Sequence, residues 1–220
     1  MINLAVVGLG YWGRRHVESA SASGRFKVIR AVDTDPGNAA VKEFADAHGI
    51  TLSASSDDAL GDAAVDAVTL ATPHNLHPGQ IRSAAAAGKH VYTEKPFALR
   101  KDLAEQSVAA CAAADVVLAL GHDQRFYPAI IEMKRLIDDG EIGTPLHIET
   151  NLSHDAHQMA HRARAASPDM TEADKNRYGA SRKPAEWRLD AEQAPTGPLV
   201  HFGIHRVDCF IHLFGNVDWV

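Results

Sequence analysis

A glycine-rich turn at the end of the first apolar segment constrains this chain more than any other feature. Residues 8–13 read Gly-Leu-Gly-Tyr-Trp-Gly and follow the run Ile2–Val7. Between a strand and a helix, GxGxxG permits a tight turn, backbone approach to a pyrophosphate and close helix–strand packing. The helix N-terminus then offers N–H groups to the phosphates. The expected cofactor contacts are Gly8, Gly10, Tyr11, Trp12 and Gly13; a purely structural turn is the alternative.

The type of dinucleotide is indicated by Asp33, which closes the second apolar run. It follows the glycine turn by about 20 residues, the spacing of the acid that binds the adenosine ribose. A carboxylate there accepts hydrogen bonds from the ribose 2′-OH and repels a 2′-phosphate. No arginine follows immediately, so NAD is favoured over NADP. The alternative is that Asp33 only caps the following turn.

The first 120 residues alternate between two kinds of segment. The apolar, β-branched runs are Ile2–Val7, Lys27–Val32, Ala67–Ala71, His90–Thr93 and Val116–Leu120. The alanine-rich stretches with helical spacing are Arg14–Ala22, Ala39–His48, Pro78–Ala87 and Lys101–Ala114. This alternation predicts an α/β fold, a doubly wound parallel sheet of the Rossmann type.

After Gly121 the pattern changes, so we expect a dinucleotide-binding domain over 1–121 and a second domain over 122–220. The second domain is expected to contain a helix at Pro128–Asp139, a strand at Leu146–Leu152 and a helix at Val200–Phe214. The polar stretch between the last two is typical of long loops.

Composition excludes several classes of protein. The 220 residues are 45% hydrophobic and 23% charged, as in globular proteins. The net charge of -6 argues against nucleic acid as the main partner. No apolar stretch approaches the ~20 residues of a membrane-spanning helix. Cys111 and Cys209 are isolated, which favours neither a disulfide framework nor a zinc site. We expect a cytoplasmic protein.

Two further motifs follow predicted strands. Thr72-Pro73-His74-Asn75-Leu76-His77 comes after Ala67–Ala71, and Glu94-Lys95-Pro96 comes after His90–Thr93. Ligands bind at the carboxyl ends of strands in open α/β sheets. The residues expected to contact the cofactor here are Thr72, Pro73, His77, Glu94 and Lys95. A lysine at this edge can also relay a proton to a substrate hydroxyl, although a surface lysine is the alternative.

These motifs, together with Gly197–Gly215 and the stretch Phe126–Gly143, resemble the Gfo/Idh/MocA family. The resemblance implies a nicotinamide-dependent oxidoreductase acting on a sugar, sugar derivative or cyclitol. It implies a Rossmann domain followed by an α+β domain whose open, mainly antiparallel sheet mediates homo-oligomers. Further sheet strands are implied after Val220, so the second domain is expected to be partial.

The resemblance also implies roles for individual residues. Lys95 would be the catalytic lysine of the EKP motif, and the Lys95-Pro96 bond is expected to be cis. The family's D-x-x-x-H pair would fall at His201 and His205, with His205 as general acid/base. His201 stands where aspartate is common, and we expect it to orient the substrate. Four residues apart, the two share a helical face. Histidine titrates near ~6.5, which suits proton transfer at working pH.

The polar stretch carries two weaker hypotheses. His154, His157 and His161 have a spacing compatible with a metal, but a solvated segment is favoured and no metal is expected. Arg188, in a Trp-Arg pair, is expected to contact the cofactor. The basic residues around it suggest a more specific hypothesis, a cationic lid that faces an acidic or phosphorylated sugar.

The sequence therefore predicts an NAD(H)-dependent dehydrogenase acting on CH-OH groups of a sugar or polyol. The alternative is a non-catalytic regulator that senses a dinucleotide or sugar, or an inactive fragment of such an enzyme, because fold does not dictate function.

Overall fold

The computed structural model describes residues 1–151 and 202–216. The chain divides into two compact units, 1–122 and 123–220, which are described separately. The strands of the first unit are β1 (Ile2–Val7), β2 (Phe26–Val32), β3 (Thr51–Ser53), β4 (Ala67–Leu70), β5 (His90–Thr93) and β6 (Leu118–Leu120). Its helices are α1 (Tyr11–Ser23), α2 (Ala39–Ala47), α3 (Ser56–Leu60), the 3₁₀ turn η1 (His74–Leu76), α4 (His77–Ala86) and α5 (Lys101–Ala113).

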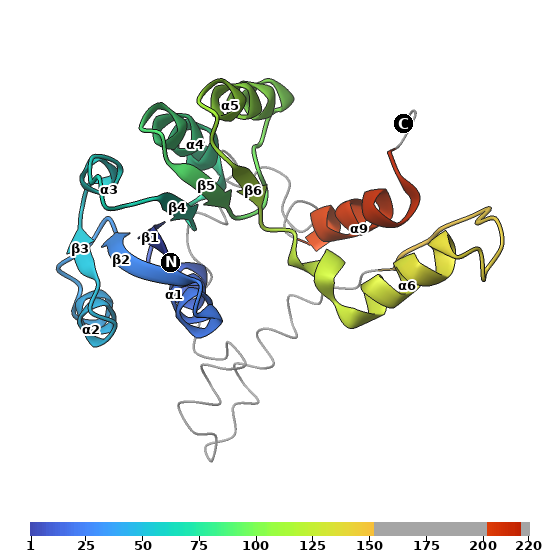
Figure 1. Cartoon of the computed structure of the whole chain (residues 1–220), viewed down its shortest axis with the longest axis horizontal. Helices are drawn as coiled ribbons and strands as arrows, with labels where there is room; N and C mark the ends of the chain where they lie inside the picture. Colours follow the sequence, from blue (N-terminus) through green and yellow to red (C-terminus); the bar gives the residue numbers. More distant parts are fainter. Residues whose placement is uncertain (152–201, 217–220) are drawn as a thin grey trace, which may run out of the picture. The chain divides into compact units, whose positions relative to one another are not determined.

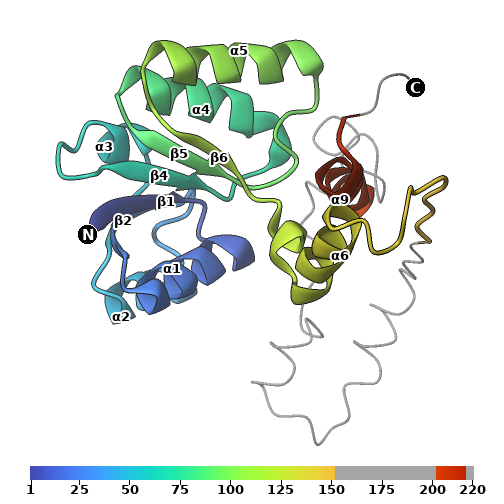
Figure 2. The same cartoon turned by 45° about the vertical axis from the view of Figure 1, so that its right-hand side comes forward.

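The first unit is a doubly wound parallel sheet, as the sequence predicts. The strand order is β3-β2-β1-β4-β5-β6 and every pairing is parallel. Helices α1 and α2 cover one face, while α3, α4 and α5 cover the other (Figures 1 and 2). The strand order reverses between β1 and β4, and in open α/β sheets ligands bind in the crevice at that point.

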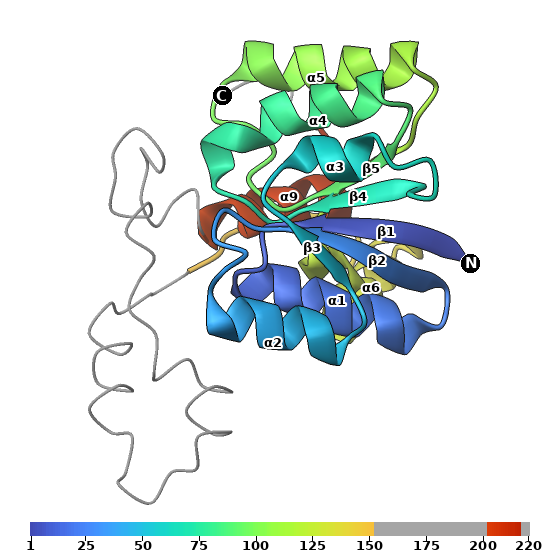
Figure 3. The same cartoon turned by 90° about the vertical axis from the view of Figure 1, so that its left-hand side faces the viewer.

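The core of this unit lies on both faces of the sheet because β1 is apolar at consecutive positions. Successive side chains of a strand point to opposite faces. Leu4 and Val6 pack with Val17 of α1, whereas Ala5 and Val7 pack with Ile81 of α4. Figure 3 shows the two helical layers with the sheet between them. This packing fixes the strand ends from which the candidate site is built.

The described helices of the second unit are the 3₁₀ turn η2 (Asp123–Phe126), α6 (Pro128–Asp138) and α9 (Ile204–Phe214). Arg125 of η2 and Asp208 of α9 form a two-bond ion pair, with Nε and Oδ2 2.7 Å apart. Asp208 is buried. This pair holds η2 against α9.

The strand expected at Leu146–Leu152 is not formed over residues 146–151, where the backbone is irregular and Leu146 is 93% exposed. A strand needs a hydrogen-bonding neighbour, and no described residue of the second unit supplies one. The antiparallel sheet expected in this domain therefore stays a prediction. Within the described parts of the chain, no helix is both long and apolar enough to cross a membrane.

Candidate functional site

The three glycines of the turn between β1 and α1 are required for different reasons. Gly8 has a φ of +91°, and a Cβ there would lie 2.9 Å from the carbonyl oxygen of Ala71. A Cβ on Gly13 would lie 1.8 Å from the carbonyl oxygen of Gly8. A Cβ on Gly10, in contrast, would meet no atom within 4 Å. The fold thus requires Gly8 and Gly13, while the space beside Gly10 is open to a ligand.

The start of α1 borders this open space. No side chain caps the helix, which begins after Gly10 and has no acidic residue in its first turn. Asn38 and Ser55, by comparison, cap α2 and α3. An N-terminus of this kind favours an anion such as a pyrophosphate. Trp12 is 48% exposed beside this turn.

Asp33 is tied directly to the glycine turn. Its Oδ2 accepts a hydrogen bond from the Leu9 amide at 2.9 Å, and its Oδ1 accepts one from the Asp35 amide at 3.1 Å. Because each carboxylate oxygen has two lone pairs, both retain acceptor capacity for ribose hydroxyls. The carboxylate therefore serves the local turn and can also serve a ligand, which combines the two interpretations of the sequence.

A small, largely apolar pocket of about 210 Å³ lies within the first unit. Its walls include Val7 and Leu70 at the ends of β1 and β4, Leu76 at the end of η1 and Gln80 in the first turn of α4. The pocket adjoins the point at which the strand order reverses. Its apolar walls suit a flat aromatic base.

His77, which is fully buried, joins the loop after β4 to the loop after β5. Its Nδ1 lies 2.9 Å from the Pro96 carbonyl oxygen and its Nε2 lies 3.0 Å from the Thr72 carbonyl oxygen. Burial lowers the pKa of His77, and the two carbonyls partly oppose this shift. A neutral ring has one N–H and so donates to one of the two carbonyls. The sequence placed His77 in contact with the cofactor; its burial favours a supporting role behind the site.

The loop after β5 contains Glu94 and Lys95, and the Lys95-Pro96 peptide bond is cis, as expected. Glu94 Oε2 accepts a hydrogen bond from the Lys95 amide at 3.2 Å. Glu94 Oε1 lies 2.9 Å from Nε2 of His16, and both side chains are mostly buried. Sequence reasoning missed His16, whose spacing on α1 gives no sign of a partner from β5. In the loop after β4, the Thr72 hydroxyl donates a hydrogen bond to Oε1 of Gln80 at 2.6 Å, and Pro73 directly precedes η1.

In the second unit, His205 lies in the first turn of α9 and its side chain is 11% exposed. Its Nδ1 is 3.8 Å from Oδ1 of Asp123. The Tyr127 hydroxyl donates to the other oxygen of Asp123 at 3.2 Å. Burial and the nearby Asp123 carboxylate raise the pKa of Tyr127, so this hydroxyl stays protonated. Asp123 is a second residue that the sequence analysis missed.

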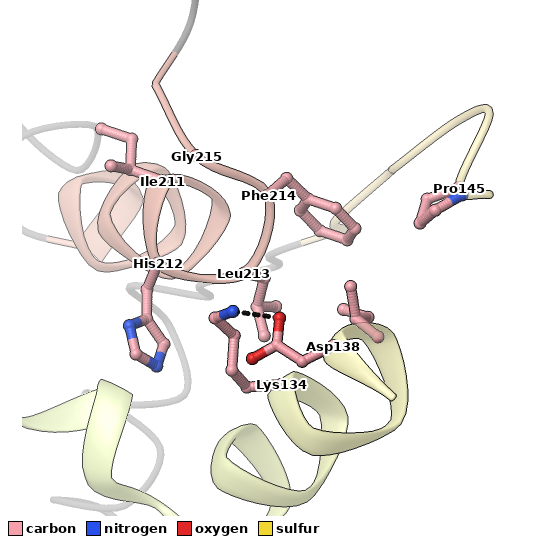
Figure 4. Close-up of a pocket in the computed structure, with 9 residues that line it drawn as sticks. Lys134, Asp138, Pro145, Ile211, His212, Leu213, Phe214 and Gly215 are labelled. Carbon is pink, nitrogen blue, oxygen red and sulfur yellow. Dashed lines mark hydrogen bonds and ion pairs between the residues drawn. The ribbon is translucent and has the colours of Figure 1, made fainter. Parts of the chain in front are cut away.

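A groove of about 560 Å³ runs between α6 and α9 farther along these helices (Figure 4). Lys134 and Asp138 pair at one wall, and Phe214 lies on another. None of the residues predicted for the site lines it. His201, Arg188 and the histidines His154, His157 and His161 lie outside the described residues.

The fold and the glycine turn define a dinucleotide-binding α/β protein. Residues 2–122 match the oxidoreductase family with an NAD-binding Rossmann fold, GFO/IDH/MocA. Residues 130–220 match the GFO/IDH/MocA C-terminal domain. The chain belongs to the Gfo/Idh/MocA oxidoreductase family.

Individual relatives agree with this assignment. The 2,7-anhydro-N-acetylneuraminate hydratase of Escherichia coli is 30% identical over 99% of this chain and 50% of its own length. Inositol 2-dehydrogenase 1 of Saccharopolyspora erythraea is 30% identical over 93% of this chain and 58% of its own. The structure of Lactobacillus casei scyllo-inositol dehydrogenase with NAD(H) and scyllo-inositol superposes with a TM-score of 0.76 at 25% identity, covering 98% of this chain and 56% of that one. The chain spans about half the length of the curated relatives it matches.

Proposed function

We propose that this chain binds NAD(H) and belongs to an enzyme that transfers a hydride between NAD(H) and a secondary hydroxyl or ketone of a sugar, sugar derivative or cyclitol. The observation that carries the proposal is the glycine turn, in which Gly8 and Gly13 are required by the fold and the space at Gly10 is open. A pyrophosphate binds where it can come close to backbone amides without meeting a side chain.

The described residues suit the parts of NAD. The uncapped start of α1 would hold the pyrophosphate, Asp33 would accept from the ribose hydroxyls, and the apolar pocket beside Leu76 would take the adenine. The cofactor would supply the hydride acceptor or donor, and the protein would supply position and electrostatics.

The proton chemistry is assigned to Lys95 and His205. In the oxidative direction, the imidazole of His205 would take the hydroxyl proton, and bound NAD⁺ would supply the acceptor for the hydride from the carbon. The ammonium group of Lys95 would stabilise negative charge that develops on a substrate oxygen. Glu94, held by His16, fixes the start of the Lys95 loop. His201 and Arg188 stay predicted contacts to the substrate and the cofactor.

A second candidate is a reaction without net oxidation. The Escherichia coli relative that aligns with 99% of this chain is named a hydratase. A sugar that is oxidised and later reduced on one enzyme ends with the cofactor unchanged. The two candidates therefore differ in whether NADH accumulates.

The test incubates the chain with NAD⁺ and a panel of cyclitols, aldoses and anhydro sugars, following NADH absorbance and the sugars by NMR. A dehydrogenase produces NADH and ketone together, whereas a hydratase converts the sugar without NADH. Lys95→Ala and His205→Ala are expected to abolish either reaction while NADH still binds. The exposed Lys101→Ala is the matched control. Full activity in both site variants would refute the assigned proton chemistry.

A further inference from the structure

The carboxylate of Asp123 lies beside the imidazole of His205, and we infer that Asp123 is a positioning residue that orients this ring for proton transfer. The inference rests on the proposed function, in which His205 exchanges a proton with the substrate. It concerns a residue from another part of the chain, on η2, that no sequence motif connects with α9.

The contact involves the ring nitrogen that matters for orientation. Nδ1 of His205 lies 3.8 Å from Oδ1 of Asp123, which is an ion-pair distance and longer than a hydrogen bond. Catalytic hydrogen bonds that are long in a free enzyme often shorten in the complex with substrate. The histidine side chain is 11% exposed and the aspartate side chain is 60% exposed. Asp123 is therefore largely exposed to solvent while it faces a mostly buried ring.

The surrounding contacts hold Asp123 in this place. The Tyr127 hydroxyl donates to Oδ2 of Asp123 at 3.2 Å, which leaves Oδ1 to face the ring. Arg125, two residues after Asp123, forms the two-bond ion pair with Asp208. Asp208 lies three residues after His205, on the same side of α9. The Arg125–Asp208 pair thus holds the turn against the helix close to the Asp123–His205 contact.

The chemistry follows from the two nitrogens of imidazole. A carboxylate opposite Nδ1 favours the tautomer with its proton on Nδ1 and stabilises the imidazolium. Nε2 is then left with a lone pair that can accept a hydroxyl proton. His201 stands where the resembled family commonly has an acid, so the sequence offers no carboxylate one turn before His205. Asp123 supplies a carboxylate to this ring from η2.

The test is a ¹⁵N imidazole NMR spectrum of the whole chain, with the resonances of His205 identified among the 13 histidines by a His205→Gln variant. In Asp123→Asn the Nδ1–H tautomer is expected to fall at least about twofold, because an amide no longer imposes one orientation. Asp139→Asn removes the same charge from the C-terminal end of α6 and is expected to leave the ring spectrum unchanged. Tyr127→Phe, which keeps the carboxylate, is expected to give a smaller change than Asp123→Asn.

The activity measurement separates this inference from the proposed function. With a substrate that the parent chain turns over, Asp123→Asn is expected to lower kcat roughly tenfold or more with little change in KM, within the range ascribed to acid–base groups. An unchanged tautomer ratio in Asp123→Asn overturns the inference whether or not the chain turns over a sugar. A shifted ratio in a chain without turnover supports the inference and counts against the proposed function alone.

Discussion

Nε2 of His16 on α1 lies 2.9 Å from Oε1 of Glu94, which follows β5. The contact joins the helix that starts at the glycine turn to the loop that carries Lys95. It also places the His16 ring against the ring of Tyr92, with centroids 5.3 Å apart. The proposed pyrophosphate site and the proposed catalytic lysine are therefore connected through one partly buried pair within the first unit.

Removing the imidazole of His16 should disturb both ends of this connection. We expect His16→Ala to lower the free energy of unfolding by about 1 kcal/mol, the usual contribution of such a bond. NADH should bind severalfold more weakly because the Glu94 loop is no longer held. His16→Gln, which can still donate to the carboxylate, should bind nearly as the parent does. His90→Ala, at the opposite end of β5, serves as the control. Equal losses of NADH affinity in His16→Ala and His90→Ala would contradict the account.

Gly10 and Gly13 should behave differently when each is replaced by alanine. Gly13→Ala is expected to lower the free energy of unfolding by about 3 kcal/mol. The added methyl would clash with the carbonyl oxygen of Gly8, which can move only if the turn moves. Urea denaturation monitored by circular dichroism measures this loss. A stability equal to that of the parent would contradict the close approach of α1 to β1.

Gly10→Ala should leave the fold nearly unchanged and weaken dinucleotide binding. The added methyl meets no protein atom within 4 Å, and the φ of Gly10, -63°, is ordinary for alanine. The same methyl would occupy the approach to the backbone, so the Kd for NADH is expected to rise about tenfold or more, a cost of about 1.4 kcal/mol. Undiminished affinity would show that the pyrophosphate lies elsewhere.

His77 predicts a dependence of stability on pH. Burial lowers its pKa below the ordinary 6.5 in the folded chain. As the pH falls from about 7 through 6.5, the unfolded chain takes up a proton before the folded one, so stability decreases toward lower pH. The contribution is at most about 1.4 kcal/mol per pH unit. Denaturation between pH 7 and 5 should show a shallower decrease in His77→Gln; equal slopes would contradict the lowered pKa.

The ion pair between Arg125 and Asp208 should stabilise α9 within the second unit. Arg125→Met removes two bonds to a buried carboxylate, for which we expect a loss of about 1–3 kcal/mol. Hydrogen exchange of the α9 amides should accelerate accordingly, while the strands of the first unit keep their protection. Arg135→Met, which removes an exposed ion-pair network on α6, should change exchange much less.

The first unit could be predicted well where its strands and helices are long enough to display their periods. The glycine turn fixed the connection between β1 and α1, and the alternation of segments indicated a parallel sheet. Strand β3 (Thr51–Ser53) and helix α3 (Ser56–Leu60) have too few residues for a period to be recognised, and our segment assignments omitted both. Strand β6 begins at Leu118, later than the predicted Val116.

The site could be predicted only where a motif is contiguous. Gly10, Asp33 and Lys95 follow strands, and their roles at the site stay predictions that rest on that position. His16 and Asp123 contact their partners through tertiary packing, and nothing in their own neighbourhood reveals it. The strand expected at Leu146–Leu152 came from local β-propensity, which depends on a neighbouring strand for its effect. The burial of His77 cannot be read from its motif, and its contact with the cofactor stays a prediction.

The most direct test of the central claim is a fluorescence titration of the chain with NADH and with NADPH, with Trp12 beside the glycine turn as one reporter. The account predicts saturable binding of NADH, at least tenfold weaker binding of NADPH, and loss of this preference in Asp33→Asn. The basis is repulsion between the Asp33 carboxylate and a 2′-phosphate. Saturable binding of NADPH as tight as NADH, or binding of neither, would contradict it.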